Sequence, residues 1–259
     1  MSDSDGATLV LVGDQFATFA THAGVATVSS FVADVRAGHY DAPRAPLGLD
    51  WGQGTTHYDR EYVRDALSAR GLLDGFPIVA PVEPAAGRYS CHKRREANAL
   101  VGGLRLIGEH RYRAALQLHP DNELMLDHQT GEHLPGLVVI EAFRQMLIAV
   151  CEQFIVSGLP PRAYGYVWHT LEMTFENFLF PVHTGLECQF EQVDMADARR
   201  VRMTAALQVD QAGTRCGLAR IEFSALDARS MAVTEHRLAR GRLDAQVGAA
   251  VAGSLAEVG

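Results

Sequence analysis

The apolar and polar residues of this 259-residue chain follow two different patterns, one in its first third and another in the remainder. In the first third, short apolar runs typical of buried parallel strands alternate with segments whose apolar residues recur at helical spacing. The expected strands are 9–12, 47–49 and 77–80, and the expected helices are 28–35 and 58–67. Such close alternation predicts a small α/β unit with a three-stranded parallel sheet.

From residue 88 onward, longer strands surround one long apolar helix, which is expected from 136 to about 156. The residues Val201, Met203 and Ala205 alternate with polar ones, as in a half-buried antiparallel strand. The expected strands are 104–107, 112–118, 167–175, 186–193, 199–209 and 216–223, with a turn at 211–213. This order predicts an α+β domain.

These patterns divide the chain into three segments, 1–87, 88–228 and 229–259. Pro81, Pro84 and the small residues up to 87 indicate a linker at the first boundary. The last segment is rich in Ala and Gly and has little periodicity, so we expect it to be frayed or disordered beyond Leu238.

The most informative stretch is a polar loop that ends in Pro135-Gly136 and leads directly into the apolar helix. That helix carries a carboxylate, Glu141, and a carboxylate among apolar residues is costly to bury unless it is paired or used. The loop supplies three possible partners: Asp127, His128 and His133.

This arrangement resembles the A-factor-biosynthesis (AfsA-type) branch of the hot-dog superfamily. That branch has an Asp-His pair in the loop, a second His before Pro-Gly, and Glu-Ala-x-Arg-Gln on the helix. The matching segments are Asp127-His128, His133-Leu134-Pro135-Gly136 and Glu141-Ala142-Phe143-Arg144-Gln145. The resemblance implies a hot-dog fold, in which an antiparallel sheet wraps around a long central helix, here preceded by the small α/β unit.

The resemblance also implies an acyltransferase-like enzyme of secondary metabolism, such as antibiotic biosynthesis. It would transfer a β-ketoacyl group from an acyl carrier protein or coenzyme A to a small phosphorylated three-carbon acceptor, forming a butenolide or γ-butyrolactone precursor. The alternatives are a dehydratase or thioesterase acting on the same thioesters, or a non-catalytic protein that binds an acyl or lactone ligand. In related dehydratases the catalytic His lies eight residues before Pro-Gly, where this chain has Asp127, which argues against dehydration.

Transfer from a thioester requires oxyanion stabilisation and a group that moves a proton. The backbone N–H groups of Gly136 and Leu137, at the helix start, are expected to face the thioester carbonyl. Glu141 is expected to act as general base, with a pKa raised by its apolar neighbours. Arg144 and Gln145 lie nearly on its face of the helix and are expected to orient it or bind the acceptor. The alternative is a purely structural ion pair between Glu141 and Arg144.

By the resemblance, Asp127, His128 and His133 complete the catalytic set. Without the motif, they would be interpreted as surface-loop residues. With Glu132 they suggest a metal site, but the helical His pair of zinc proteases is missing, so we expect no metal and no cofactor.

Three other segments carry weaker signals. The basic run 92–95 is either a binding patch for phosphopantetheine or an acidic carrier protein, or a solvated charge run. Residues 51–54 are expected to form a turn, because their glycine spacing does not fit a nucleotide-binding loop. Met173, Phe175, Phe178 and Phe180 are expected in the core rather than in a cofactor-binding site.

The composition of the chain indicates which classes of binding partner and which cellular location to expect. The net charge of −8 argues against nucleic acid or an anionic membrane surface as a partner. The chain lacks a twenty-residue apolar run and begins without the basic residues of a secretory signal. Four widely spaced cysteines indicate reduced, mostly buried thiols in a cytoplasmic protein. The resemblance implies a homodimer, unless the N-terminal unit covers the open sheet edge in a monomer.

Overall fold

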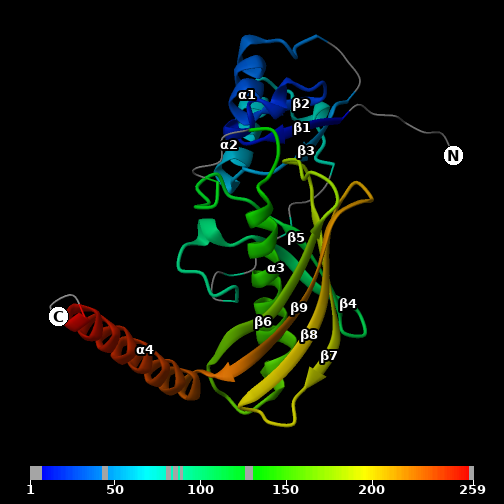
Figure 1. Cartoon of the computed structure of the whole chain (residues 1–259). Helices are drawn as coiled ribbons and strands as arrows, with labels where there is room; N and C mark the ends of the chain where they lie inside the picture. The colour runs from blue at the N-terminus through cyan, green and yellow to red at the C-terminus, as the bar shows by residue number, and fades with distance from the viewer. Residues whose placement is uncertain are drawn as a thin grey trace.

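The computed structural model describes residues 8–42, 46–79, 83, 87, 90–125 and 131–256. Figure 1 shows a small N-terminal unit above a larger domain, and a C-terminal helix that extends away from both. Most of the linker predicted around Pro81 and Pro84 lies outside the described residues. The boundaries at 87 and 228 therefore remain predictions.

The N-terminal unit is a parallel sheet with the strand order β2-β1-β3. Its elements are β1 Thr8–Val12, β2 Val25–Thr27, α1 Val28–Ala37, β3 Gly48–Trp51 and α2 His57–Ala69, with 3-10 turns at Asp14–Phe16, Phe19–Thr21 and Leu73–Gly75. The predicted three-stranded sheet is confirmed, but its third strand is β2. The predicted strand at 77–80 is reduced, within its described residues, to one bridge between Ile78 and Leu49.

Both helices of this unit begin at residues that the sequence marks as caps. The Thr27 side chain accepts a hydrogen bond from the backbone N–H of Ser30 at the start of α1. Thr56 and Asp59 form a reciprocal capping box at the start of α2. α1 ends at Gly38, whose φ of 82° lies in the left-handed region that glycine adopts without strain.

The two faces of the N-terminal sheet are buried against different parts of the molecule. Leu11 and Leu49 pack with residues of α1 and α2 in a small core of the unit itself. Val10 and Val12, which point to the opposite face, belong to the core of the larger domain. One sheet therefore joins the two units through apolar contact.

A turn after β3 fastens the units together, as its backbone and one buried glutamine bond to the larger domain. The Gln53 side chain donates to the carbonyls of Leu116 and Val182, both at 3.1 Å, and accepts from the N–H of Leu118 at 2.8 Å. Gly52 lies so close to the Pro181 carbonyl that a Cβ there would be 2.4 Å from its oxygen. The predicted turn at 51–54 is confirmed and serves as the docking loop of the N-terminal unit.

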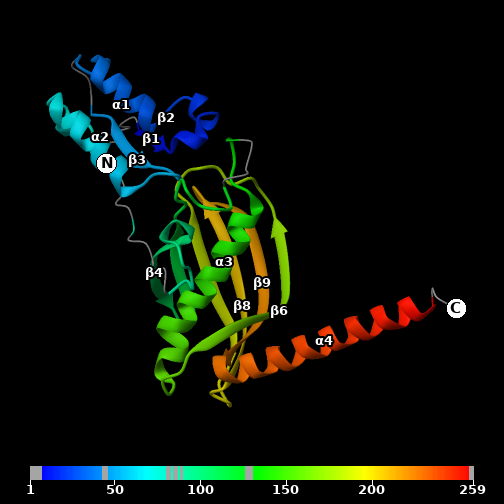
Figure 2. The same cartoon turned by 90° about the vertical axis from the view of Figure 1, so that its left-hand side faces the viewer.

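The larger domain is a six-stranded antiparallel sheet, in the order β4-β5-β7-β8-β9-β6, that curves around a central helix (Figure 2). Its elements are β4 Val101–Gly108, β5 Arg111–Leu116, α3 Gly136–Val150, β6 Tyr164–Phe175, β7 Gly185–Asp194, β8 Arg200–Gln211 and β9 Thr214–Asp227. The helix continues as a π turn, Cys151–Ile155, and a 3-10 turn, Val156–Gly158; another 3-10 turn, Glu96–Asn98, precedes β4. Every strand predicted in this domain is present, and the hot-dog architecture is confirmed.

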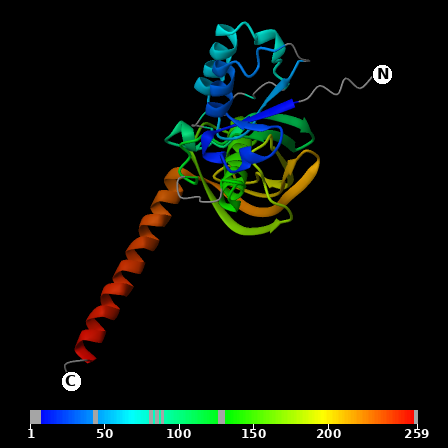
Figure 3. The same ribbon diagram turned by 90° about the horizontal axis from the view of Figure 1, so that it is seen from above.

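The C-terminal segment differs from its prediction. α4, Ala228–Ala256, is a continuous helix that projects from the domain (Figure 3). The expectation of a frayed chain beyond Leu238 is wrong, because Ala and Arg favour helix even without an apolar stripe. Near its start, Met231 packs closely against Gly165 of β6. None of the described helices is both long and apolar enough to cross a membrane.

Candidate active site

The predicted motif lies at the start of α3, where the chain enters the core of the hot-dog domain. Pro135 is the N-cap, and the N–H of Leu134 donates to the carbonyl of Leu179 at 2.8 Å, which fixes the entry. The first N–H groups of a helix, here those of Gly136 and Leu137, have no partner within the helix. Leu137 is 64 % exposed, so this end of α3 is open to a ligand on one side.

An aromatic ring, rather than open space, lies against Gly136. A Cβ on Gly136 would be 2.9 Å from Cζ of Phe175, so only glycine permits this packing. Phe175 is 50 % exposed and Phe178 is 69 % exposed, and the Phe178 ring lies 5.0 Å from that of His133. The expectation of core residues is wrong for Phe175, Phe178 and Phe180, whereas Met173 is partly buried and packs against the core. Phe175 ends β6, an edge strand with one side uncovered, and Phe178 and Phe180 lie in the connection that follows β6.

Only part of the predicted loop is described, because Asp127 and His128 lie outside the described residues. The end of the loop is held by the N-terminal unit: the N–H of Phe19 donates to the Gly131 carbonyl at 3.2 Å. The Nε2 atom of His22 is 2.6 Å from Oε1 of Glu132. The N-terminal unit therefore braces the segment that leads into α3.

The Glu141 carboxylate lies about one and a half turns into α3 and is bound by three side chains. Lys93 Nζ is 2.5 Å from Oε1 of Glu141. Arg144 donates to both carboxylate oxygens, from Nε at 2.7 Å and from Nη2 at 2.9 Å, and Gln145 donates at 3.0 Å. The side chain of Glu141 is 19 % exposed, so Lys93, Glu141 and Arg144 form a half-buried ionic cluster.

This cluster reverses the expected electrostatics of Glu141. Burial alone would raise its pKa, but hydrogen bonds from Arg144, Lys93 and Gln145 and the charge of Arg144 lower it to about 2. The expectation of a raised pKa for Glu141 is wrong. Lys93 lies far from Glu141 in the sequence, so their contact could not be predicted from the helix motif alone. In turn, the hydrogen bond to Glu141 raises the pKa of Arg144.

Gln145 is fully buried and joins α3 to the start of β4. Its amide nitrogen donates to the carbonyl of Asn98 at 2.8 Å, and its oxygen accepts from the N–H of Leu100 at 2.7 Å. With the additional bond to Glu141, its side chain makes three hydrogen bonds within the protein. Gln145 therefore fixes the strand beside the ionic cluster.

A second polar cluster, made of His92, Glu152 and Tyr166, was not expected from the sequence. His92 Nε2 is 3.2 Å from Oε1 of Glu152, and the Tyr166 hydroxyl donates to the same oxygen at 3.0 Å. Burial raises the pKa of Tyr166, so its hydroxyl stays protonated. His92 has a φ of 52°, a conformation that non-glycine residues rarely adopt, and Glu152 lies in the π turn. Both features occur often at functional sites.

The cysteines are all free and buried, as expected. Cys91 lies near the ionic cluster, but burial raises its pKa to about 11, so it stays a thiol at neutral pH. Among the described residues, no group of three or more His, Cys, Asp or Glu side chains is placed to hold a metal ion.

Comparison with known families supports the motif. The A-factor biosynthesis hotdog domain (AfsA) family matches residues 79–227, which is more than half of the chain. No curated protein matches the sequence.

Among solved structures, a conserved protein from Pseudomonas aeruginosa aligns with a TM-score of 0.38 and 12 % identity, over 54 % of this chain and 100 % of that one. A putative thioesterase from Shewanella oneidensis aligns with a TM-score of 0.37 and 8 % identity, over 49 % and 83 %. A thioesterase from Haemophilus influenzae aligns with a TM-score of 0.35 and 11 % identity, over 49 % and 78 %.

Proposed function

Because the chain belongs to the A-factor biosynthesis hotdog domain family, we propose that it is an enzyme of secondary metabolism that acts on acyl thioesters. The proposed reaction is the transfer of a β-ketoacyl group from an acyl carrier protein or coenzyme A. The acceptor is a hydroxyl group of a small phosphorylated three-carbon molecule, and the product leads to a butenolide or γ-butyrolactone.

The observation that carries this proposal is the ionic cluster beside the open start of α3. Two cations, Lys93 and Arg144, share one carboxylate, so the cluster keeps a net positive charge in a half-buried position. Such a charge stabilises the oxyanion that forms when a thioester carbonyl is attacked. The first N–H groups of α3, at Gly136 and Leu137, would add to this stabilisation.

We assign Glu141 the role of positioning Lys93 and Arg144. A carboxylate with a pKa of about 2 is ionised at neutral pH but binds a proton weakly, so it is a poor general base. Arg144 already donates twice to Glu141, which favours a shared role in this cluster over the predicted phosphate grip.

The proton acceptor in this proposal is one of the two predicted loop histidines, His128 or His133, which precede the start of α3. It would take the proton of the acceptor hydroxyl as its oxygen attacks the thioester carbon, and return it to the departing thiolate. The other histidine and Asp127 would orient the thioester or the acceptor. His92 has no such role in the proposal, because it is bound to Glu152, which lies eleven residues beyond Glu141 and about 16 Å farther along the helix.

The test is to incubate the protein with a β-ketoacyl thioester, with and without dihydroxyacetone phosphate, and to measure thiol release. Release that depends on the acceptor, together with formation of the ester, supports transfer. Release without the acceptor would identify a thioesterase, loss of water without thiol release a dehydratase, and binding without turnover a non-catalytic protein.

We also propose that the protein is a homodimer. Leu137, Phe175 and Phe178 form an exposed apolar surface beside the start of α3, which a second copy would cover. Light scattering that gives the mass of one chain would contradict the dimer. It would favour a monomer in which the N-terminal unit covers the open edge of the sheet.

A further inference from the structure

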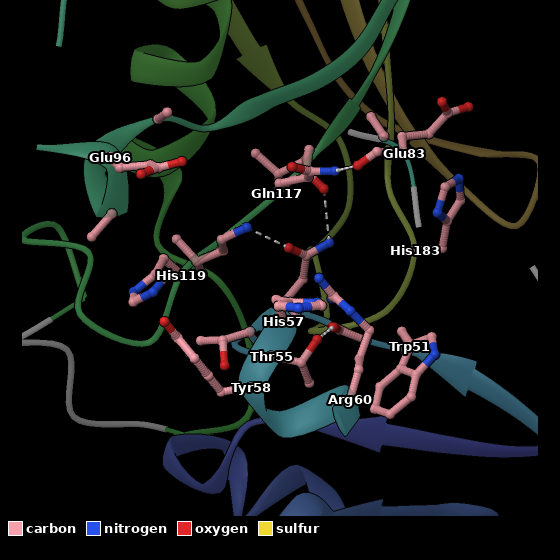
Figure 4. Close-up of a pocket in the computed structure, with 18 of the residues that line it drawn as sticks. Trp51, Thr55, His57, Tyr58, Arg60, Glu83, Glu96, Gln117, His119 and His183 are labelled. Atoms are coloured by element: carbon pink, nitrogen blue, oxygen red, sulfur yellow. Dashed lines mark hydrogen bonds between the residues drawn. The ribbon is translucent and has the colours of Figure 1, made fainter. Parts of the chain in front are cut away.

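A cleft of about 690 Å³ lies between the N-terminal unit and the hot-dog domain (Figure 4). Its size suits a small-molecule site. Residues from the end of β3 to the first turn of α2 face residues that follow β5 across it. Trp51, Thr55, His57 and Arg60 lie on one side, and Gln117 and His119 on the other. The cleft is separate from the ionic cluster, since neither Lys93 nor Glu141 lines it.

Arg60 distinguishes this cleft from an ordinary gap between units. It is half-buried, and among the residues that the structure describes its guanidinium has no hydrogen-bond or ion-pair partner. Burial lowers its pKa, against the opposing charge of Asp59, but a guanidinium remains charged at neutral pH. A partly desolvated cation without a partner is unfavourable, so an anion would complete the site.

The carboxylates that also line the cleft do not supply this anion. Glu83 pairs with Arg105 at 3.1 Å, and Asp50 accepts the N–H of Trp51 at 2.9 Å. Glu96 lies on the hot-dog side, across the cleft from Arg60 (Figure 4). None of these carboxylates pairs with Arg60, and the neighbouring Asp59 attracts its charge without forming an ion pair with it.

A second, apolar groove of about 500 Å³ adjoins the cleft and shares Trp51, His57 and Arg60 with it. Its other residues are mostly apolar: Leu49, Val63, Leu67, Leu73, Phe76 and Ile78. Ile78 is 52 % exposed and Leu73 43 %, so apolar surface remains uncovered along the groove. Apart from Arg60, the charged residues that line the groove are Glu61 and Arg64, which pair with each other at 3.4 Å.

We propose that these adjoining cavities bind an amphiphilic anion. Its head group, a carboxylate or a phosphate monoester, pairs with Arg60, and its alkyl or acyl chain lies along the groove toward Phe76 and Ile78. Charge complementarity fixes the head, and burial of apolar surface holds the chain. This site does not depend on the reaction proposed above, because it uses none of the same residues.

The ligand class is tested by calorimetric titration of the full chain with ten-carbon probes below their micelle concentrations. Decyl phosphate and decanoate should bind, decanol at least tenfold more weakly, and decyltrimethylammonium not measurably. The ratio of the two anions identifies the preferred head group. Affinity should rise about two- to fourfold per methylene from hexyl to decyl phosphate. Equal binding of decanol, or of inorganic phosphate and decyl phosphate, would overturn the proposal.

The location is tested with two matched variants on α2. Arg60→Ala should weaken decyl phosphate binding about tenfold or more, because a charge-assisted contact is lost. Arg70→Ala removes the same charge at the C-cap of α2, where the side chain pairs with Asp41 and lines neither cavity, and should change affinity less than about twofold. Arg60→Lys, which keeps the charge, should lie between them. Equal effects of Arg60→Ala and Arg70→Ala, or none in either, would contradict the site. Thermal melting confirms that each variant is folded.

A spectroscopic measurement places the probe independently of these variants. The chain has two tryptophans, Trp51 in the cleft and Trp168 on β6. In a Trp168→Phe protein, decyl phosphate should change the fluorescence of Trp51 in parallel with the calorimetric binding curve. Saturation without any change in Trp51 emission would place the ligand elsewhere.

Discussion

Arg144 and Arg60 are both half-buried, but their surroundings are opposite. Arg144 donates two hydrogen bonds to Glu141, in a cluster that also contains Lys93. Arg60 faces a cleft, and in the described part of the chain its guanidinium forms no hydrogen bond or ion pair, although the neighbouring Asp59 attracts it. Arg144 belongs to a recognisable motif and Arg60 to none. An arginine that belongs to a sequence motif can thus be used for contacts within the protein. An arginine outside any motif can be the one whose guanidinium is free to bind a ligand.

The largest effect is expected from removing the charge at the centre of the cluster. Glu141→Gln keeps the shape of the side chain but releases Lys93 and Arg144, so turnover should fall by about two to four orders of magnitude. A folded Glu141→Gln protein with most of its wild-type turnover would contradict the proposed role.

Acid should remove the stability that the cluster provides. The pKa of Glu141 is lowered from an ordinary value near 4.5 to about 2, so its contribution is present above pH 4.5 and is lost as the pH falls toward 2. The shift corresponds to a contribution on the order of 3 kcal/mol. Urea unfolding between pH 7 and pH 2.5 measures it. Glu141→Gln should flatten this pH dependence, and an unchanged curve would argue against the ion pairs.

Two buried glutamines link separate segments of the chain, one beside the ionic cluster and one beside the cleft, and their substitution can be compared directly. Gln145 bonds α3 to the start of β4, and Gln53 bonds the N-terminal unit to the hot-dog domain. Replacing either with Ala leaves buried backbone groups unpaired and should destabilise the protein by about 2 kcal/mol. Gln153→Ala, at an exposed position, is the control and should change stability by less than about 0.5 kcal/mol. Similar losses at all three positions would show that the effect is not specific.

The smallest differences concern the stability of the two arginine variants. Arg144→Ala should cost about 1–2 kcal/mol, because Glu141 loses its bidentate partner in a half-buried site. Arg60→Ala should cost less than about 0.5 kcal/mol, since no described contact of its guanidinium is lost. Thermal melts of both variants provide the comparison. A large loss in Arg60→Ala would mean that Arg60 supports the fold and would weaken its assignment to a ligand.

Most of the hot-dog domain was predictable, because its strands alternate cleanly and its motif is local. The pairing of Arg144 with Glu141 was also predictable, since residues three apart on a helix are neighbours. β2 was missed because a strand of three residues is too short to show alternation. α4 was missed because helix propensity, unlike amphipathic spacing, leaves no pattern.

The candidate site was only partly predictable, for a physical reason. Lys93 and His92 reach α3 and its π turn from a distant loop, and only the folded chain brings them there. Their arrival changes the sign of the expected pKa shift of Glu141. Gln53 reads as part of a polar turn, although its side chain is 6 % exposed and joins two units. Tertiary contacts between distant segments therefore decide the chemistry that the motif alone suggests.

The projecting helix α4 affects how the protein moves through solution. A helix of 29 residues is about 43 Å long, comparable to the width of a small domain, and it extends away from the rest of the molecule. Such a rod increases hydrodynamic drag much more than mass. A monomer would therefore elute from a sizing column ahead of a globular standard of 28.2 kDa and mimic a larger assembly. Diffusion-based measurements on a chain shortened before α4 would separate shape from association.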